Sequence, residues 1–183
     1  ETNLGELIVF SNKTNAYKVR ICDIADCKLS QMGEFLKSVL EFEADEEVID
    51  VFPANGYAGY FLFAYDNGKA AKIPLESYKT KTNRKKLINS YSDKARLIKI
   101  IYLKEDCEMV AYSNIGKILV FDSSQVNPKT TRNSAGVQVL TLRKGARLKK
   151  ISELSKTRLK EPNYYKTKNI PAVGCFQKAE SDE

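Results

Sequence analysis

Short apolar runs occur along this chain in pairs, and each pair is joined by a tight polar turn. The clearest pair covers residues 109–113 and 117–121, on either side of Asn114-Ile115-Gly116. Runs rich in β-branched and aromatic residues are typical of strands, and a glycine next to an asparagine favours the left-handed backbone of a short turn. The pattern therefore predicts a β-hairpin over residues 109–121.

The hairpin pattern occurs three times. The copies begin at Leu7, Phe61 and Met109, which are 54 and 48 residues apart, and a second pair of apolar runs follows each hairpin. About four short strands in a repeat of this size are typical of a propeller-type blade. The alternative is a single β-sandwich with accidental internal similarity. The repeats favour an all-β fold of about three to four four-stranded blades.

The repeats divide the 183 residues into four parts. We expect one domain or fragment with repeat 1 at 4–56, repeat 2 at 57–105, repeat 3 at 106–151, and a C-terminal tail at 152–183 that docks in part on the last blade. So few residues are short of a closed propeller, and the chain begins at Glu1 rather than methionine. The sequence therefore predicts a partial or open disc, which is either a fragment of a longer domain or a short, open form of it.

Several local predictions accompany the repeats. In the first hairpin Thr14 takes the place of the glycine, and Asn15 is expected to adopt the strained turn conformation instead. Residues 38–42 are predicted as a strand, residues 152–160 as a short helix, and the apolar residues 169–176 as a final strand.

Composition excludes several classes of function. The chain has no histidine, its four cysteines form no CxxC pair, and its glycines form no phosphate-binding loop. We therefore expect no metal, no cofactor and no catalytic residue, with an enzyme as the disfavoured alternative. No apolar run is long enough to cross a bilayer and no signal peptide is present, so we expect a soluble, cytoplasmic protein without a membrane partner.

The net charge of +7 is unevenly distributed. Residues 1–56 carry −6, residues 57–105 carry +7, residues 106–151 carry +5, and residues 152–183 carry +1. In a radial repeat fold, equivalent loops of successive blades lie side by side. The basic loops at 79–86 and 127–137 should therefore form one stripe, which suits the regular charge array of duplex DNA.

The candidate phosphate contacts belong to these two basic repeats. Each one also has the simpler interpretation of a solvated surface charge. As a set they are Lys69, Lys72, Lys81, Arg84, Lys85, Lys86, Lys117, Lys129, Arg132, Arg143 and Lys144. The alternative function is a protein-interaction propeller whose basic rim binds an acidic partner.

Two other clusters have a structural interpretation. Aromatic residues that alternate within strands are interpreted as packing between blades rather than as base-stacking surfaces. The acidic residues at 41–47 are interpreted as a solvated turn rather than a metal site, and they would end a DNA path at the first blade. The aromatic residues are Tyr60, Phe61, Phe63, Tyr112 and Phe121.

The repeated motifs resemble the C-terminal domain of the A subunit of bacterial type IIA topoisomerases, namely DNA gyrase and topoisomerase IV. The resemblance covers residues 4 to 176. It rests on an Asn/Asp-x-Gly-Lys hairpin that is followed by a polar linker with Arg-x-x-x-Gly-Val. It also rests on the sequence near the C-terminus, at residues 168–174. The segments that carry it are 66–72, 113–117, 131–137 and 168–174.

The resemblance implies a β-pinwheel whose basic rim bends duplex DNA without reading its sequence. It places the strand-cleaving tyrosine in a separate N-terminal domain, and ATP and magnesium in other parts of the holoenzyme. The implied partners are the ATPase B subunit together with the rest of the A subunit, and this chain is expected to be monomeric.

One departure concerns the gyrase loop Gln-(Arg/Lys)-Arg-Gly-Gly-(Arg/Lys)-Gly, which this chain lacks. Its positional counterparts are residues 30–36, 81–87 and 131–137, and the first of these retains only Gly33. The departure favours either a topoisomerase IV-like role or a fragment that lacks the blade with the gyrase loop, and gyrase-type supercoiling remains open at this point.

Overall fold

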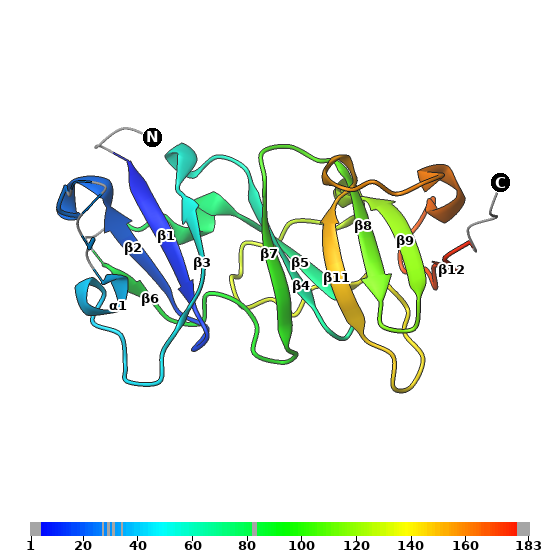
Figure 1. Ribbon diagram of the computed structural model, residues 1–183, viewed down its shortest axis with the longest axis horizontal. Coiled ribbons are helices and arrows are strands. Elements are labelled where there is room, and N and C mark those ends of the chain that lie inside the picture. Colours follow the sequence, from blue (N-terminus) through cyan, green and yellow to red (C-terminus); the bar gives the residue numbers. More distant parts are fainter. Residues whose placement is uncertain are drawn as a thin grey trace.

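Three four-stranded antiparallel sheets follow one another along the long axis of the computed structural model (Figure 1). The sheet that contains β1 lies at one end of the row, and the sheet that contains β12 lies at the other. This confirms the predicted all-β fold and its repeat of four-stranded blades. The structure describes residues 5–26, 28, 30, 32–33, 35–81 and 84–178.

The strands are ordered in the same way in each sheet. The first sheet consists of β3 (Val48–Pro53), β1 (Glu6–Ser11), β2 (Ala16–Arg20) and β6 (Lys86–Leu87). The second consists of β10 (Val137–Gln138), β5 (Lys69–Pro74), β4 (Tyr60–Tyr65) and β7 (Leu97–Leu103). The third consists of β11 (Leu148–Glu153), β8 (Glu108–Ser113), β9 (Lys117–Asp122) and β12 (Cys175–Phe176).

Helices are few and short in the described part of the chain. None of them is long and apolar enough to span a bilayer. They are α1 (Leu36–Val39) and the 3-10 turns η1 (Ile21–Asp23), η2 (Asn55–Tyr57), η3 (Leu75–Tyr78), η4 (Ser123–Gln125), η5 (Leu154–Lys156) and η6 (Pro162–Tyr165).

The outer strand of each hairpin pairs with a strand of only two residues that comes from later in the chain. In the first sheet Ala16 is paired with Leu87, and in the third Ile118 is paired with Cys175. In the second sheet Ala70 is paired with Val137. The segments that precede β6 and β10 therefore each connect one blade to the edge of the preceding blade.

Each sheet also has the same irregularity. The first strand of each hairpin also pairs with an edge strand, which is β3, β7 or β11. The register of this pairing shifts next to Ser11 in the first sheet, next to Tyr65 in the second and next to Leu148 in the third. A bulge at the same place in all three sheets shows that the repeats share backbone geometry as well as sequence pattern.

The two cores lie between successive sheets, and β4 contributes to both of them. Phe61 and Phe63 point toward the first sheet, where Phe10 meets their rings edge-on at centroid distances of 5.3 and 5.6 Å. Leu62 and Ala64 point to the other side and pack with the third sheet. Successive strand residues face opposite sides, so a central strand buried on both faces is apolar throughout.

The predicted role of the strand aromatics in packing between blades is confirmed by these clusters for four of the five residues and is wrong for Tyr112. Phe61, Phe63 and Phe121 are fully buried within them. Tyr60 is partly buried against the second cluster, and Tyr112 packs on the outer face of the third sheet.

Other segments of the chain cover the outer faces of the end sheets. Leu36 and Leu40 pack on Val9 and Tyr17 of the first sheet, and Tyr165 packs on the third. The prediction of a strand at 38–42 is wrong, because these residues include the end of α1. Leucines four residues apart lie on one side of a helical turn, and here that side covers the sheet.

Two further local predictions are wrong. Thr14, at φ 60°, takes the left-handed turn position that Gly68 takes in the second hairpin, at φ 79°. Asn15 is buried instead and uses its side chain as a hydrogen-bond donor. The helix predicted at 152–160 is only the single turn η5, because β11 continues to Glu153.

Candidate nucleic-acid interface

The two basic loops occupy equivalent places in neighbouring blades. In the first, Lys18 donates its backbone N–H to the carbonyl of Lys85 at 2.8 Å, just before β6 joins β2. In the second, Lys129 donates its N–H to the carbonyl of Lys72 at 2.8 Å, before β10 joins β5. Each loop is therefore held along the second strand of a hairpin, so the two loops have the equivalent positions that the repeat pattern predicted.

A third loop of this kind, which we did not predict, lies in the C-terminal tail. Thr167 donates its N–H to the carbonyl of Val120 at 2.9 Å, and β12 then joins β9. The sequence Lys-Thr-Lys occurs both at 79–81 and at 166–168. This shared triplet was the signal that could have identified Lys166 and Lys168 as counterparts of the first loop.

The eleven predicted residues differ in exposure. Lys81, Arg84, Lys85, Lys129, Arg143 and Lys144 are exposed, whereas Lys69, Lys86, Lys117 and Arg132 are half-buried and Lys72 is buried. Three of the half-buried residues have specific contacts. Lys86 pairs with Glu43 at 3.6 Å, Lys117 lies 5.0 Å from the ring centre of Phe176, and Arg132 donates to the carbonyl of Ser77 at 3.0 Å.

Lys72 is only 2% exposed, so its ammonium group does not reach the surface. It forms an ion pair with Asp106 and lies 4.7 Å from the ring centre of Tyr60. Burial alone would raise the pKa of Asp106, but the hydrogen bonds from Lys72 and Ser123 outweigh it and lower that pKa. Lys72 therefore holds the second and third blades together, and we leave it out of the proposed interface.

A basic hollow of about 390 Å³ lies where the first loop meets the first blade. Hydrogen bonds between side chains of its lining fix two parts of its wall. Arg20 donates to Asp23 at 2.8 and 3.0 Å, and Tyr57 donates its hydroxyl to Glu6 at 2.5 Å. The lining residues are Glu6, Lys18, Arg20, Asp23, Tyr57, Lys79, Thr80, Lys81, Arg84 and Lys85.

Three cations in this hollow form no close ion pair with a described carboxylate, although the pKa of Asp23 is lowered by the hydrogen bond from Arg20 and also by the charge of Lys85. Lys81, Arg84 and Lys85 are exposed, and no described carboxylate lies within ion-pair distance of them. Their positive charge is therefore available to an external anion. The described part of the chain thus combines a preformed concave surface with an excess of exposed cations at this place.

The hollow also includes basic residues that we did not predict. Lys18 and Arg20 alternate along β2 with the buried Tyr17 and Val19, so both face the hollow side of the strand. Lys79 completes the group, with its ammonium 5.9 Å from the ring centre of Tyr57. Period-two alternation in the first hairpin was the available signal for the two residues of β2.

The remaining predicted residues lie at the hairpin tips. Lys69 and Lys117 are the first residues of β5 and β9, next to their turns. Arg143 and Lys144 lie in the turn before β11. Arg147, just after them, forms an ion pair of 2.9 Å with Asp66 at the tip of the hairpin of β4 and β5. The structure therefore divides the predicted set between the hairpin tips and the crossing loops.

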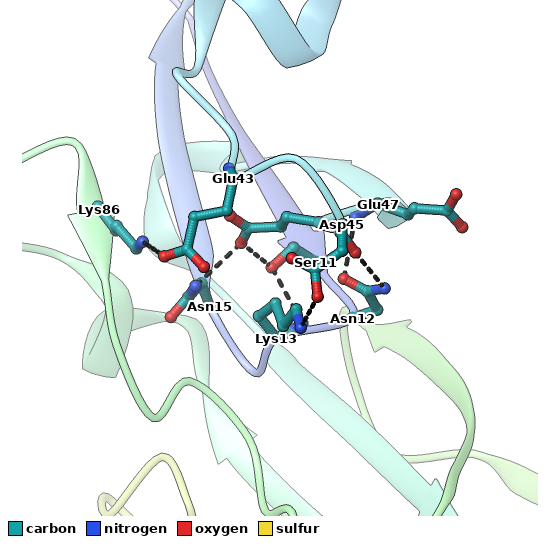
Figure 2. A network of polar contacts seen from close by, with 9 residues as sticks. Ser11, Asn12, Lys13, Asn15, Glu43, Asp45, Glu47 and Lys86 are labelled. Carbon is teal, nitrogen blue, oxygen red and sulfur yellow. Dashed lines mark hydrogen bonds and ion pairs between the residues drawn. The ribbon is translucent and has the colours of Figure 1, made fainter.

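The acidic turn at 41–47 borders the first loop (Figure 2). Glu43 neutralises Lys86, and Asp45 pairs with Lys13. No group of residues able to hold a metal is found among the described residues. The carboxylates of this turn therefore compensate lysines of the first hairpin and of the first loop.

The prediction of a solvated turn is wrong for Glu46, which is fully buried. Its carboxylate accepts hydrogen bonds from Ser11, from Asn15 at 2.9 Å and from the Tyr17 hydroxyl at 2.8 Å. Burial opposes ionisation, but these donors outweigh it and lower the pKa of Glu46 to about 2. This residue is a structural anchor of the first hairpin.

The fold and the basic loops together define a β-pinwheel domain, and the comparisons with known structures agree. The C-terminal domain of DNA topoisomerase IV aligns with a TM-score of 0.72 and 25% identity, over 83% of this chain and 48% of that one. The E. coli ParC C-terminal domain aligns with a TM-score of 0.65 and 13% identity, over 82% of this chain and 62% of that one. The DNA gyrase A C-terminal domain aligns with a TM-score of 0.58 and 19% identity, over 82% of this chain and 48% of that one.

Curated relatives show the same resemblance. The A subunit of DNA topoisomerase 4 from Staphylococcus epidermidis is 25% identical over 140 residues, and that from Staphylococcus aureus is 26% identical over 140 residues. The match covers 75% of this chain but only 17% of each relative. No family model matches the chain. The predicted resemblance to C-terminal domains of type IIA topoisomerase A subunits is thereby confirmed.

Proposed function

We propose that this chain binds duplex DNA as the C-terminal domain of a type IIA topoisomerase A subunit. The observation that carries the proposal is the concave surface at the first loop, where Lys81, Arg84 and Lys85 form no close ion pair with a described carboxylate. Phosphates are the natural counterions for such a group, and the resemblance to the C-terminal domain of topoisomerase IV supports DNA as their source.

Contacts of this kind hold a duplex without reading its bases. Lysine and arginine side chains on loops bind phosphate oxygens, which are the same at every base pair. Each phosphate contact releases counterions, so the logarithm of affinity should fall by roughly 0.9 per contact for each tenfold rise in salt. The proposed binding is therefore strong at low salt and independent of sequence.

Bending follows from the arrangement of the loops. Equivalent loops on successive blades would offer phosphate contacts at several points along the row, and in this proposal the duplex curves to meet all of them. Bending a site of 20–30 base pairs by 40–90° costs on the order of 1–6 kcal/mol, which a few added phosphate contacts can offset. The bent duplex would be presented to a cleavage core outside this chain.

In this proposal the chemistry lies elsewhere in the enzyme. The rest of the A subunit cleaves DNA, the B subunit uses ATP and magnesium, and this monomeric domain in the bacterial cytoplasm supplies DNA binding. The absence of the gyrase loop from the counterpart segments favours a topoisomerase IV-like activity. Of these segments, residues 31, 34, 82 and 83 lie outside the part that the structure describes.

The test is a charge reversal in the hollow. The triple variant Lys81→Glu, Arg84→Glu, Lys85→Glu is compared with a matched control, Lys94→Glu, Lys99→Glu, Lys104→Glu, which changes the net charge equally at exposed sites of the same repeat. We expect the first variant to lose at least about tenfold in duplex affinity and to show a shallower salt slope.

The matched control distinguishes a specific binding surface from a general effect of the net positive charge. It should lose much less affinity and keep the original slope. Equal losses in both variants would mean that net charge alone attracts DNA. Unchanged affinity in the first variant would favour the alternative that this surface binds an acidic protein.

A further inference from the structure

A second hollow, of about 770 Å³, lies on the outer face of the third sheet. Its walls come from β8, β9 and β11 on one side and from residues 156–161 and 177–178 of the tail on the other. None of the eleven predicted DNA-binding residues lines it. Its volume falls within the range of about 300–1,000 Å³ that is usual for ligand pockets.

The floor of this hollow is apolar and well ordered by packing. Ile118 and Tyr165 are buried in the cluster that covers the third sheet, and Tyr112 and Leu159 are partly buried against it. Tyr112 and Leu159 present the accessible aromatic and aliphatic surface of the floor, and the buried Ile118 and Tyr165 support it from below. A ligand that fills it must therefore bring an apolar group of its own.

The rim is strongly basic. Five lysines and arginines line the hollow together with a single acidic residue, Glu161. Glu161 is already paired with Lys178 at 2.5 Å. Lys150 and Arg158 are exposed, and no described carboxylate lies within ion-pair distance of either. The rim therefore offers positive charge to a ligand that also carries anionic groups.

We propose that this hollow binds an acidic peptide segment of a partner protein. One apolar or aromatic side chain of the peptide packs on Tyr112 and Leu159, and flanking carboxylates pair with Lys150 and Arg158. A duplex is a poorer fit, because its rigid backbone has no apolar group to place on the floor. The site is separate from the proposed DNA surface and does not depend on it.

The probe is a fluorescein-labelled, glutamate-rich peptide with one central phenylalanine, followed by fluorescence anisotropy. We expect saturable binding to the chain. The double variant Lys150→Glu, Arg158→Glu should lower the peptide affinity by about tenfold or more, because both substitutions place like charges at the rim. A peptide with serine in place of the phenylalanine should also bind more weakly.

The control is Lys99→Glu, Lys104→Glu, which has the same change in net charge at exposed sites outside the hollow. It should bind the peptide almost as well as the unaltered chain. Melting temperatures of all variants are compared, and we expect them to be alike because the substituted side chains are exposed.

Duplex binding distinguishes the two proposals. The hollow variant should keep its duplex affinity, and the Lys81, Arg84, Lys85 variant should keep its peptide affinity. Absence of peptide binding, or equal loss in the control, would overturn the proposal. Tighter binding of a single-stranded oligonucleotide than of the peptide, abolished by the same variant, would also overturn it in favour of a nucleic-acid site.

Discussion

Lys72 and Glu46 are charged side chains that the fold uses internally, although both belong to segments rich in surface charge. Both are buried. Lys72 forms an ion pair with Asp106, between β7 and β8, and Glu46 accepts a hydrogen bond from Tyr17 of β2. A buried charge persists in a folded protein only when such partners compensate its lost hydration. At the scale of the residue, the density of charge in the sequence is therefore a poor guide to the charge available for binding.

Replacing Lys72 with methionine should separate stability from binding. The change leaves the Asp106 carboxylate and the backbone carbonyl of Ser123 without their cationic partner, so we expect a loss of roughly 1–3 kcal/mol in the free energy of unfolding. Duplex affinity of the folded variant should be nearly unchanged. Urea unfolding and fluorescence anisotropy measure the two quantities. Weaker DNA binding at unchanged stability would contradict the structural role.

Glu46→Gln should destabilise the protein in a pH-dependent way. The pKa of Glu46 in the folded protein is about 2, below its ordinary value of 4.5. The stability contributed by its ionisation is therefore complete above pH 4.5 and is lost as the pH falls toward 2. At neutral pH we expect the variant to unfold more easily by roughly 1–3 kcal/mol.

Denaturant unfolding at several pH values tests this expectation. The stability difference between the two proteins should narrow as the pH falls through that interval, because the glutamine does not titrate. A difference that stays constant across the interval would show that ionisation of Glu46 contributes nothing. Asp50→Asn, a half-buried acidic residue in the same repeat, is the control.

At the scale of the element, the sequence predicts hairpins well and their fourth strands poorly. Runs such as 109–113 carry a periodic signal over several residues. β6, β10 and β12 contain only two residues each, and they are strands only because a neighbouring hairpin offers an unpaired edge. Such strands depend on tertiary contacts, which no local pattern encodes.

The same distinction applies to the candidate site. The equivalence of the two basic loops followed from the repeat, and the structure reproduces it. The contribution of Lys18 and Arg20 to the hollow depends on where residues 79–85 cross β2. The burial of Lys72 depends on Asp106, which comes from the next repeat. These placements are set by packing between repeats rather than within one.

Gly136→Ala should weaken the attachment of β10 to β5. Gly136 has a φ of 76°, and an added Cβ would lie 2.2 Å from the carbonyl oxygen of Ala70. The backbone must shift there, which should disturb the pairing of Val137 with Ala70 and the loop that precedes it. We expect a clearly lower melting temperature and weaker duplex binding than in the unaltered chain.

Gly145→Ala is the matched control for that change. Gly145 has a φ of 84° but no atom within 4 Å of an added Cβ. It should therefore cost only the roughly 1–2 kcal/mol of a left-handed non-glycine residue. Similar melting temperatures for the two variants would show that the close approach at Gly136 is unimportant.

At the scale of the whole molecule, the basic loops are repeated from blade to blade and the acidic turn lies at one end. The tail supplies the third loop, so we expect it to extend the DNA surface to the third blade. Lys168→Glu should reduce duplex affinity and lower the salt slope by about one phosphate contact. Lys104→Glu is the control, since both lysines are exposed. Equal effects would exclude a specific role for the third loop.

The most direct test of the central claim is a salt titration of this chain with a duplex of about 40 base pairs, labelled at both ends for energy transfer. If about six lysines and arginines engage phosphates, the slope of log affinity against log salt should be about −5, and energy transfer should rise on binding because the ends approach. Binding without a rise in energy transfer would contradict bending. Absence of binding at low salt would contradict the DNA-binding function itself.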